Sequence, residues 1–184
     1  MVRIYSFLAL LILFSAPVRA EIDDTTISRL ERLTPVETLV FERGRCFGTC
    51  PIYRVWFNRD GRLRYVGYAY TLWEGVRESY RDPLVFEQAI DLAQDFRPAS
   101  LGFHEFDAQC EVFWTDSPTY RIKWIDAEGR ETTLSHYTGC ASRRSQDFVD
   151  LLDEIEALVS TADWAGYETQ EDLTISPLSR SGHR

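Results

Sequence analysis

The chain has few of the residues that most often carry out catalysis. Only three of its 184 residues are histidine, and no serine lies in a Gly-x-Ser-x-Gly elbow. A nucleophilic triad would have to combine His136 or His104 with Asp116 and either Ser135 or Ser117. A half-buried, hydrogen-bonded side chain is the simpler interpretation of His136, because it shares a strand face with apolar residues. The sequence therefore predicts no catalytic set.

Metal-binding spacings are absent as well. No His-x3-His or Cys-x2-Cys pair occurs, and the nearest candidates are His104, Glu105, Asp107 and the distant His136. Zinc needs three or four ligands at fixed geometry, which this arrangement does not offer. We predict neither a metal ion nor a cofactor.

Positive charge is in the minority. The chain has 20 Lys and Arg against 29 Asp and Glu, which gives a formal net charge of −9. Phosphate backbones repel such a protein, so nucleic-acid binding is not expected. Arginines concentrate between residues 41 and 64, whereas residues 145–178 contain acids and no base. Either the two regions balance each other across the fold, or the arginine side binds an anion.

A long apolar run occurs only near the start of the chain. Arg3 precedes an apolar run over residues 5–14, and Val18 and Ala20 place small side chains before a potential cut. This pattern predicts a secretory signal peptide in residues 1–20, cleaved after Ala20. The run is shorter than the roughly 20 residues that span a bilayer. We therefore expect a periplasmic or secreted protein with no stable membrane insertion after cleavage.

Alternating side chains predict most of a sheet. Residues 53–67 and 120–137 read as two hairpins, each with a glycine-containing turn, and residues 37–41 and 76–80 read as further strands. Residues 100–118 show no period and are expected to be irregular.

Two stretches have helical periodicity. Asp82 and Pro83 are typical of a helix start, and an apolar face follows as far as Phe96. A second apolar stripe runs to Val159, with Ser145 as the expected N-cap. The result is an α+β fold, an antiparallel sheet of five or six strands with two amphipathic helices packed on one face. We expect an N-terminal extension (21–36), one domain (37–162) and a mostly disordered tail (163–184).

Four cysteines are present, at positions 46, 50, 110 and 140. An even number in an exported chain predicts disulfides, and local spacing favours Cys46–Cys50 and Cys110–Cys140 among the three pairings. A redox role for Cys46 and Cys50 is the alternative, since nearby arginines would favour a thiolate. Their Cys-x3-Cys spacing and the strand that follows favour a structural ring.

The most unusual stretch begins at Arg43 and ends at Tyr53, with the pattern Arg-x-x-Cys-Phe-Gly-x-Cys-Pro-x-Tyr. Followed by a strand, an Asp-Gly turn and a second strand, it resembles a bacterial family of exported proteins known as domain of unknown function 6438. The resemblance covers residues 37–159. It implies the fold and export, and it implies no activity. Cys110 and Cys140 lie outside the family's pattern, and their joint presence supports their pairing.

These observations predict a non-catalytic binding module of the cell envelope or the secreted fraction. Its partner would be an envelope protein or a small anionic ligand. The expected ligand surface surrounds the Cys46–Cys50 loop and uses Arg43, Arg45, Arg54, Tyr53, Tyr65 and Trp73. The alternative is a protein similar to thiol-disulfide oxidoreductases, which would use Cys46 and Cys50.

Overall fold

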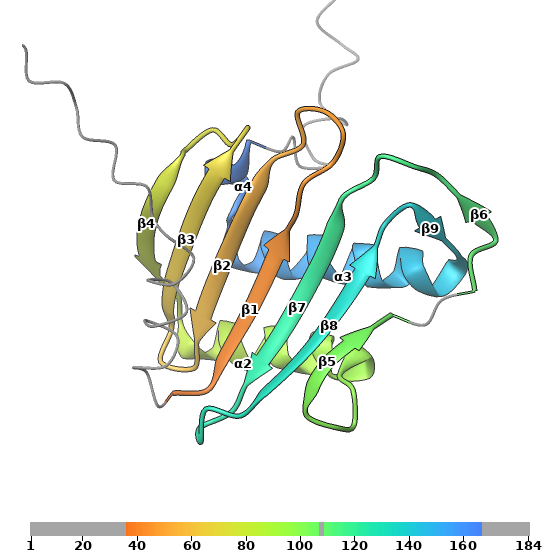
Figure 1. Cartoon of the computed structure of the whole chain (residues 1–184). Coiled ribbons are helices and arrows are strands. Elements are labelled where there is room, and N and C mark those ends of the chain that lie inside the picture. Colours follow the sequence, from red (N-terminus) through yellow and green to blue (C-terminus); the bar gives the residue numbers. More distant parts are fainter. Residues whose placement is uncertain (1–35, 107–108, 167–184) are drawn as a thin grey trace, which may run out of the picture.

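The computed structural model describes residues 36–106 and 109–166. The predicted signal peptide, nearly all of the N-terminal extension and the tail after residue 166 lie outside the described residues. The main feature is a seven-stranded sheet in the order β4-β3-β2-β1-β7-β8-β5, accompanied by a small two-stranded sheet, β6-β9 (Figure 1). The bounds are β1 Thr38–Arg43, β2 Ile52–Asn58, β3 Arg62–Ala69, β4 Gly75–Tyr80, β5 Gly102–Glu105, β6 Val112–Phe113, β7 Thr119–Ile125, β8 Glu131–Tyr137 and β9 Cys140–Ala141.

The sheet differs from the prediction in one respect: it has an additional edge strand, β5, which pairs in parallel. Both predicted hairpins are present as β2–β3 and β7–β8, and β1 and β4 lie where strands were expected. However, residues 100–118 are not wholly irregular, because β5 pairs with β8 in parallel. The sheet is therefore mixed and seven-stranded rather than antiparallel with five or six strands. Four residues of edge strand are too few to show a period of two, which is why the sequence did not reveal β5.

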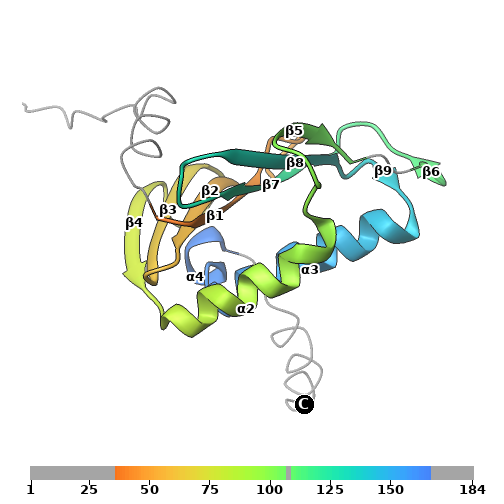
Figure 2. The same cartoon turned by 90° about the horizontal axis from the view of Figure 1, so that it is seen from below.

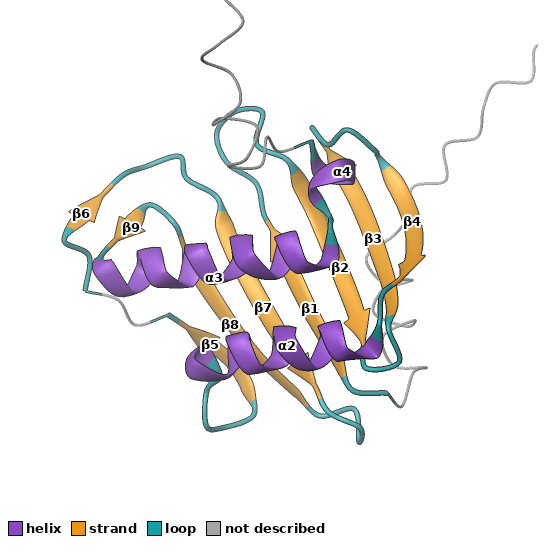
Figure 3. Ribbon diagram, turned by 180° about the vertical axis from the view of Figure 1, so that it is seen from behind, coloured by secondary structure: helices purple, strands orange, loops and turns teal. Residues whose placement is uncertain are grey.

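Two helices cover one face of the sheet, as predicted (Figures 2 and 3). They are α2, Pro83–Ala93, which continues as the 3-10 turn η1, Gln94–Phe96, and α3, Arg143–Val159. The Asp82 side chain accepts a hydrogen bond from Leu84 N at 2.9 Å, so the predicted start of α2 is confirmed.

The start of α3 was predicted three residues too late. Ser142 is the N-cap, and Ser145 is the third helical residue of a capping box in which each side chain accepts from the other's backbone N–H. Arg143 and Arg144 are exposed, so the first turn contributes nothing to the apolar stripe that marked the helix.

The core lies between the helices and the inner face of the sheet. Its largest fully buried side chains include Trp124, Tyr53, Tyr65, Phe41, Phe57, Phe86 and Phe148. A further short helix, α4 (Ala162–Ala165), packs Trp164 against the Tyr65 ring with 5.5 Å between centroids. The packed part of the chain thus continues past residue 162, where the domain was predicted to end. The outer face carries a smaller buried cluster of Val40, Trp56, Val66 and Ile125.

Candidate functional site

The loop between β1 and β2 is fixed at both its sulfurs and its backbone. A disulfide joins Cys46 to Cys50. Gly44 N donates to Thr119 O at 2.9 Å, and Phe47 N donates to Asp116 O at 3.1 Å, so the loop is tied to the connection that leads into β7. A Cβ on Gly44 would lie 2.7 Å from Thr119 O, which explains a glycine there. The fixed loop presents Phe47 with 87% of its side chain exposed.

Other exposed apolar side chains lie at the same end of the sheet. We call the group the aromatic rim; its members are Phe47, Tyr70, Leu72, Trp73, Phe113 and Trp114. All six belong to connections at the edge where β1, β3 and β8 end and where β2, β4 and β7 begin, or to β6 beside it (Figure 1). Five of the six are more than half exposed, and several large exposed apolar side chains along one edge of a sheet are typical of a contact surface.

Local geometry holds in place the rim residues of the connection between β3 and β4. The connection between β3 and β4 folds back over Gly67, where an added Cβ would lie 2.1 Å from Trp73 O. Trp73 N donates to Trp164 O at 2.9 Å, and the Arg77 guanidinium lies 3.7 Å from the centre of the Trp73 ring. Tyr70 has a φ of +57°, a left-handed conformation that aromatic residues seldom adopt. Such outliers are maintained by their surroundings and are frequent at functional sites.

The rim residues in and after β6, Phe113 and Trp114, depend on the second disulfide. Cys110–Cys140 connects the segment before β6 to β9, and β6 pairs with β9 at Val112↔Ala141 and Phe113↔Cys140. Trp114 N donates to Gly139 O at 2.8 Å. The structure therefore contains both predicted disulfides, and each one fixes a segment that bears rim residues. All four cysteines are in disulfides, so a redox function of Cys46 and Cys50 would begin with attack of a substrate thiolate on their disulfide.

Three residues predicted for the ligand surface lie inside the protein. Tyr53 and Tyr65 are completely buried, with ring centroids 5.4 Å apart, because strand alternation places them on the helix-facing side with Val55. Burial raises the pKa of Tyr65 to about 12. Arg43 is only 5% exposed. None of the three can touch a ligand at the surface, so they are removed from the candidate site.

Arg43 joins β1 to helix α3 by a buried ion pair. Its Nε and Nη2 donate to the two carboxylate oxygens of Glu156, both at 2.8 Å, and Nη1 donates to the Tyr120 hydroxyl at 2.7 Å. The guanidinium also pairs with Asp153 and lies 4.4 Å from the centre of the Tyr120 ring. The first arginine of the motif therefore anchors the loop rather than binding a partner.

The other predicted residues are at the surface, in two different places. Arg45 is exposed in the disulfide loop and Trp73 belongs to the aromatic rim. Arg54 lies on the outer face of the sheet, paired with Glu42. The structure therefore brings Arg45 and Trp73 to one edge and places Arg54 in a separate cluster.

The candidate triad is not assembled. His136 is 3% exposed and packs against the rings of Phe106 and Phe148, at 4.9 and 5.8 Å between centroids, and this burial lowers its pKa. Asp116 is exposed in the connection between β6 and β7, where it accepts a hydrogen bond from Thr115 Oγ1. Within residues 36–106 and 109–166 no group of three or more His, Cys, Asp or Glu side chains is arranged to hold a metal ion. In the same part of the chain no helix has both the length and the apolar character of a membrane span.

The fold and the rim define a class of protein, a small α+β domain whose helix-covered sheet presents a disulfide-closed loop at one edge. The model of a protein family described as Domain of unknown function (DUF6438) matches residues 37–159, and the chain belongs to this family. The match begins just before β1 and ends at the last residue of α3. No curated protein matches the chain.

Sequence reasoning missed most of the rim. Phe113 and Trp114 lie in a segment without periodicity, and Leu72 lies in a loop. One feature of the sequence could have indicated these exposed residues. Large apolar residues are concentrated in stretches rich in turn-forming residues, where core residues are not expected.

Proposed function

We propose that this protein is a non-catalytic binding module of the cell envelope or the secreted fraction, and that its aromatic rim docks on a partner protein. The observation that carries the proposal is Phe47, a phenylalanine 87% exposed at the tip of a covalently closed loop. Burying such a side chain on a partner contributes about 1.5–3 kcal/mol. The ring of five residues is worth only about 2 kcal/mol to folding by the loop-entropy model, so its shape is better explained by presentation of Phe47.

Rigidity supports the same conclusion. A loop whose backbone is held by a disulfide and by hydrogen bonds loses little backbone entropy when it binds, which raises affinity for a given contact area. Aromatic anchors surrounded by further apolar residues are typical of interface centres. Arg45, exposed beside the ring, suits an acidic residue at the periphery of the partner's surface.

Site-specific photocrosslinking tests the proposal. A photoreactive phenylalanine analogue replaces Phe47 or Trp114, and the protein is irradiated in an envelope extract of the source cells. Both positions should give the same discrete crosslinked product. The control position is Leu84, which is 68% exposed on α2. Equal products from Leu84, or none from Phe47, would refute the proposed surface.

Affinity measurements then give the size of the effect. Against the purified crosslinked partner, Phe47→Ala should weaken binding by about 10- to 100-fold, the equivalent of the apolar contribution above. Leu84→Ala should bind as the unaltered protein does. Because Phe47 is almost fully exposed, neither substitution should change the thermal midpoint.

A further inference from the structure

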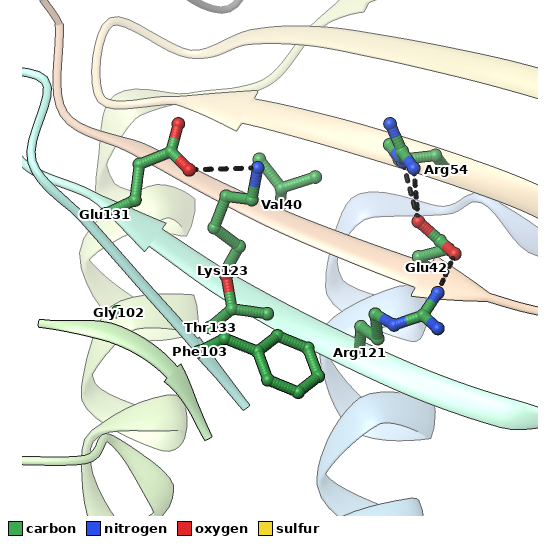
Figure 4. A pocket seen from close by; sticks show the side chains of 9 residues that line it. All are labelled: Val40, Glu42, Arg54, Gly102, Phe103, Arg121, Lys123, Glu131 and Thr133. Atoms are coloured by element: carbon green, nitrogen blue, oxygen red, sulfur yellow. Dashed lines mark hydrogen bonds and ion pairs between the residues drawn. The ribbon is translucent and has the colours of Figure 1, made fainter. Parts of the chain in front are cut away.

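The outer face of the sheet carries an ordered array of charged and apolar side chains. Cross-strand pairing places Arg54, Glu42 and Arg121 in one row, from β2, β1 and β7. The next row contains Val40, Lys123, Thr133 and Phe103, from β1, β7, β8 and β5. Both rows point away from the two helices, so they form a surface separate from the core (Figure 4). None of these residues belongs to the aromatic rim.

These rows enclose a hollow of about 410 Å³, a volume within the range of small-molecule sites. Val40, only 3% exposed, gives it an apolar floor. Phe103, 60% exposed on the edge strand β5, forms an apolar wall. Arg54, Glu42 and Arg121 lie along one side, and Lys123 and Glu131 along another (Figure 4).

The described residues that line the hollow include three bases and two acids. Arg54 Nη2 and Arg121 Nη1 both bind the Glu42 carboxylate, each at 2.6 Å, so two guanidinium groups share one carboxylate. Lys123 and Glu131, 3.3 Å apart, neutralise each other. Among the described lining residues cationic side chains therefore outnumber carboxylates, in a chain whose formal net charge is −9.

Glu42 holds the arginines rather than filling the hollow. Its side chain is 15% exposed and that of Arg54 is 19% exposed, whereas that of Arg121 is 41% exposed. Arg54 also lies 5.5 Å from the centre of the Trp56 ring, which fixes it further. Arg121 is therefore the guanidinium that faces solvent. The Lys123–Glu131 pair is partly exposed and weak, so an anion can compete for Lys123.

We infer that this hollow binds a small amphipathic anion. Its carboxylate, phosphate or sulfonate group would bind Arg121 and Lys123, and its aromatic or branched apolar group would pack on Phe103 and Val40. A cationic ligand would be disfavoured, because the described residues that line the hollow include three bases and two acids. The inference does not depend on the proposed protein partner, since the two surfaces share no residue.

The experiment uses Lys123, which is the only lysine in the sequence. Reductive methylation with ¹³C-formaldehyde keeps the positive charge and gives one lysine signal by NMR, besides that of the terminal amine. The probes are phenyl phosphate, inorganic phosphate and benzyl alcohol, titrated into the folded full chain. The Lys123 signal should shift saturably with phenyl phosphate, at concentrations at least about 10-fold lower than either other probe requires.

Variants assign the two parts of the ligand. Arg121→Met should weaken phenyl phosphate binding by about 10-fold or more, because charge-assisted hydrogen bonds are lost. Phe103→Ala should weaken phenyl phosphate and leave inorganic phosphate unchanged. Glu42→Gln should strengthen both anions, since it raises the local charge by one. Arg62→Met is the matched control; Arg62 is exposed, paired with Asp60 and remote from the hollow, and its loss should change nothing.

Four results would overturn the inference. They are no saturable shift, equal affinity for phenyl phosphate and benzyl alcohol, equal affinity for both phosphates, and no effect of Arg121→Met in a variant whose thermal midpoint lies within about 2 °C of the unaltered protein. A shift caused by phosphatidylglycerol vesicles but not by phenyl phosphate would also overturn it and assign this face to a membrane surface.

Discussion

Arg43 gives the sharpest test of how the motif works. Arg43 is 5% exposed, and its guanidinium makes two hydrogen bonds to Glu156, which is itself 6% exposed. Arg43→Met keeps much of the side-chain volume but leaves the Glu156 carboxylate buried without a countercharge. Breaking a buried pair in this way costs about 3–5 kcal/mol. We therefore expect the free energy of unfolding to fall by about 4 kcal/mol, a large part of the 5–15 kcal/mol that domains usually have.

A double-mutant cycle separates the ion pair from simple packing. In Arg43→Met/Glu156→Met both charges are removed and apolar side chains replace them, a change that is often neutral or stabilising. The double variant should thus be more stable than either single variant, with a coupling energy of about 3 kcal/mol. Asp153, whose side chain is 58% exposed, should contribute under about 1 kcal/mol, so Asp153→Asn is the control within the same cluster.

Urea unfolding followed by tryptophan fluorescence measures these values, since Trp124 lies in the core. The slope of the unfolding free energy against urea concentration should be the same in all variants. It would be refuted if Arg43→Met lost less than about 1 kcal/mol, or if the losses of the two single variants added up in the double variant.

Three further outcomes follow from other buried groups. Burial holds the pKa of His136 below its usual 6.5, so the unfolded chain binds a proton more readily than the folded protein does. The contribution of His136 to stability should be complete above pH 6.5 and fall as the pH drops below it, by up to about 1.4 kcal/mol per pH unit. The His136→Phe variant should show a smaller difference between urea unfolding curves at pH 7 and pH 5. Removing Cys46–Cys50 by serine substitution should cost about 2 kcal/mol, while removing Cys110–Cys140, which closes a longer loop, should cost about 3.5 kcal/mol; a reversed order in thermal midpoints would contradict the loop-entropy reasoning. If Cys46–Cys50 is structural, mild dithiol buffers that reduce thioredoxin-like pairs should leave it intact, whereas its selective reduction would favour the oxidoreductase alternative.

Local patterns predicted most of the fold because they are repeated along each element. The two hairpins have long alternating strands with glycine turns, and α2 has both an Asp cap and a proline at its first turn. Such signals depend only on neighbours in sequence. The parallel edge strand β5 depends on residues of β8 some thirty positions away, and no local pattern encodes that pairing.

The site was harder to predict for a related reason. Arginines alternate with aromatic residues on β2 and β3, which indicates two faces but not which one the helices cover. Tyr53 and Tyr65 were assigned to the open face, whereas they share the covered face with Val55 and Leu63. Conversely, Phe47 and Trp114 lie in stretches without a strand or helix period, so no local pattern says that their side chains are exposed. Only the packing of the layers decides these cases.

The structure also explains why the motif is longer than its disulfide. Arg43 and Tyr53 form a cross-strand pair, the last one before the loop, and both are buried against the helix layer. The loop therefore starts from a base that is held on one side by the Arg43–Glu156 ion pair and on the other by the Tyr53–Tyr65 contact. A disulfide of four residues' separation alone would close a ring that is free to tilt. With the base fixed, the backbone that carries Phe47 is held in place by the ring and by the hydrogen bond from Phe47 N to Asp116 O. On this argument the buried residues of the motif and its exposed phenylalanine serve the same end, the presentation of a rigid apolar contact, so loss of Arg43 should weaken partner binding even in molecules that remain folded.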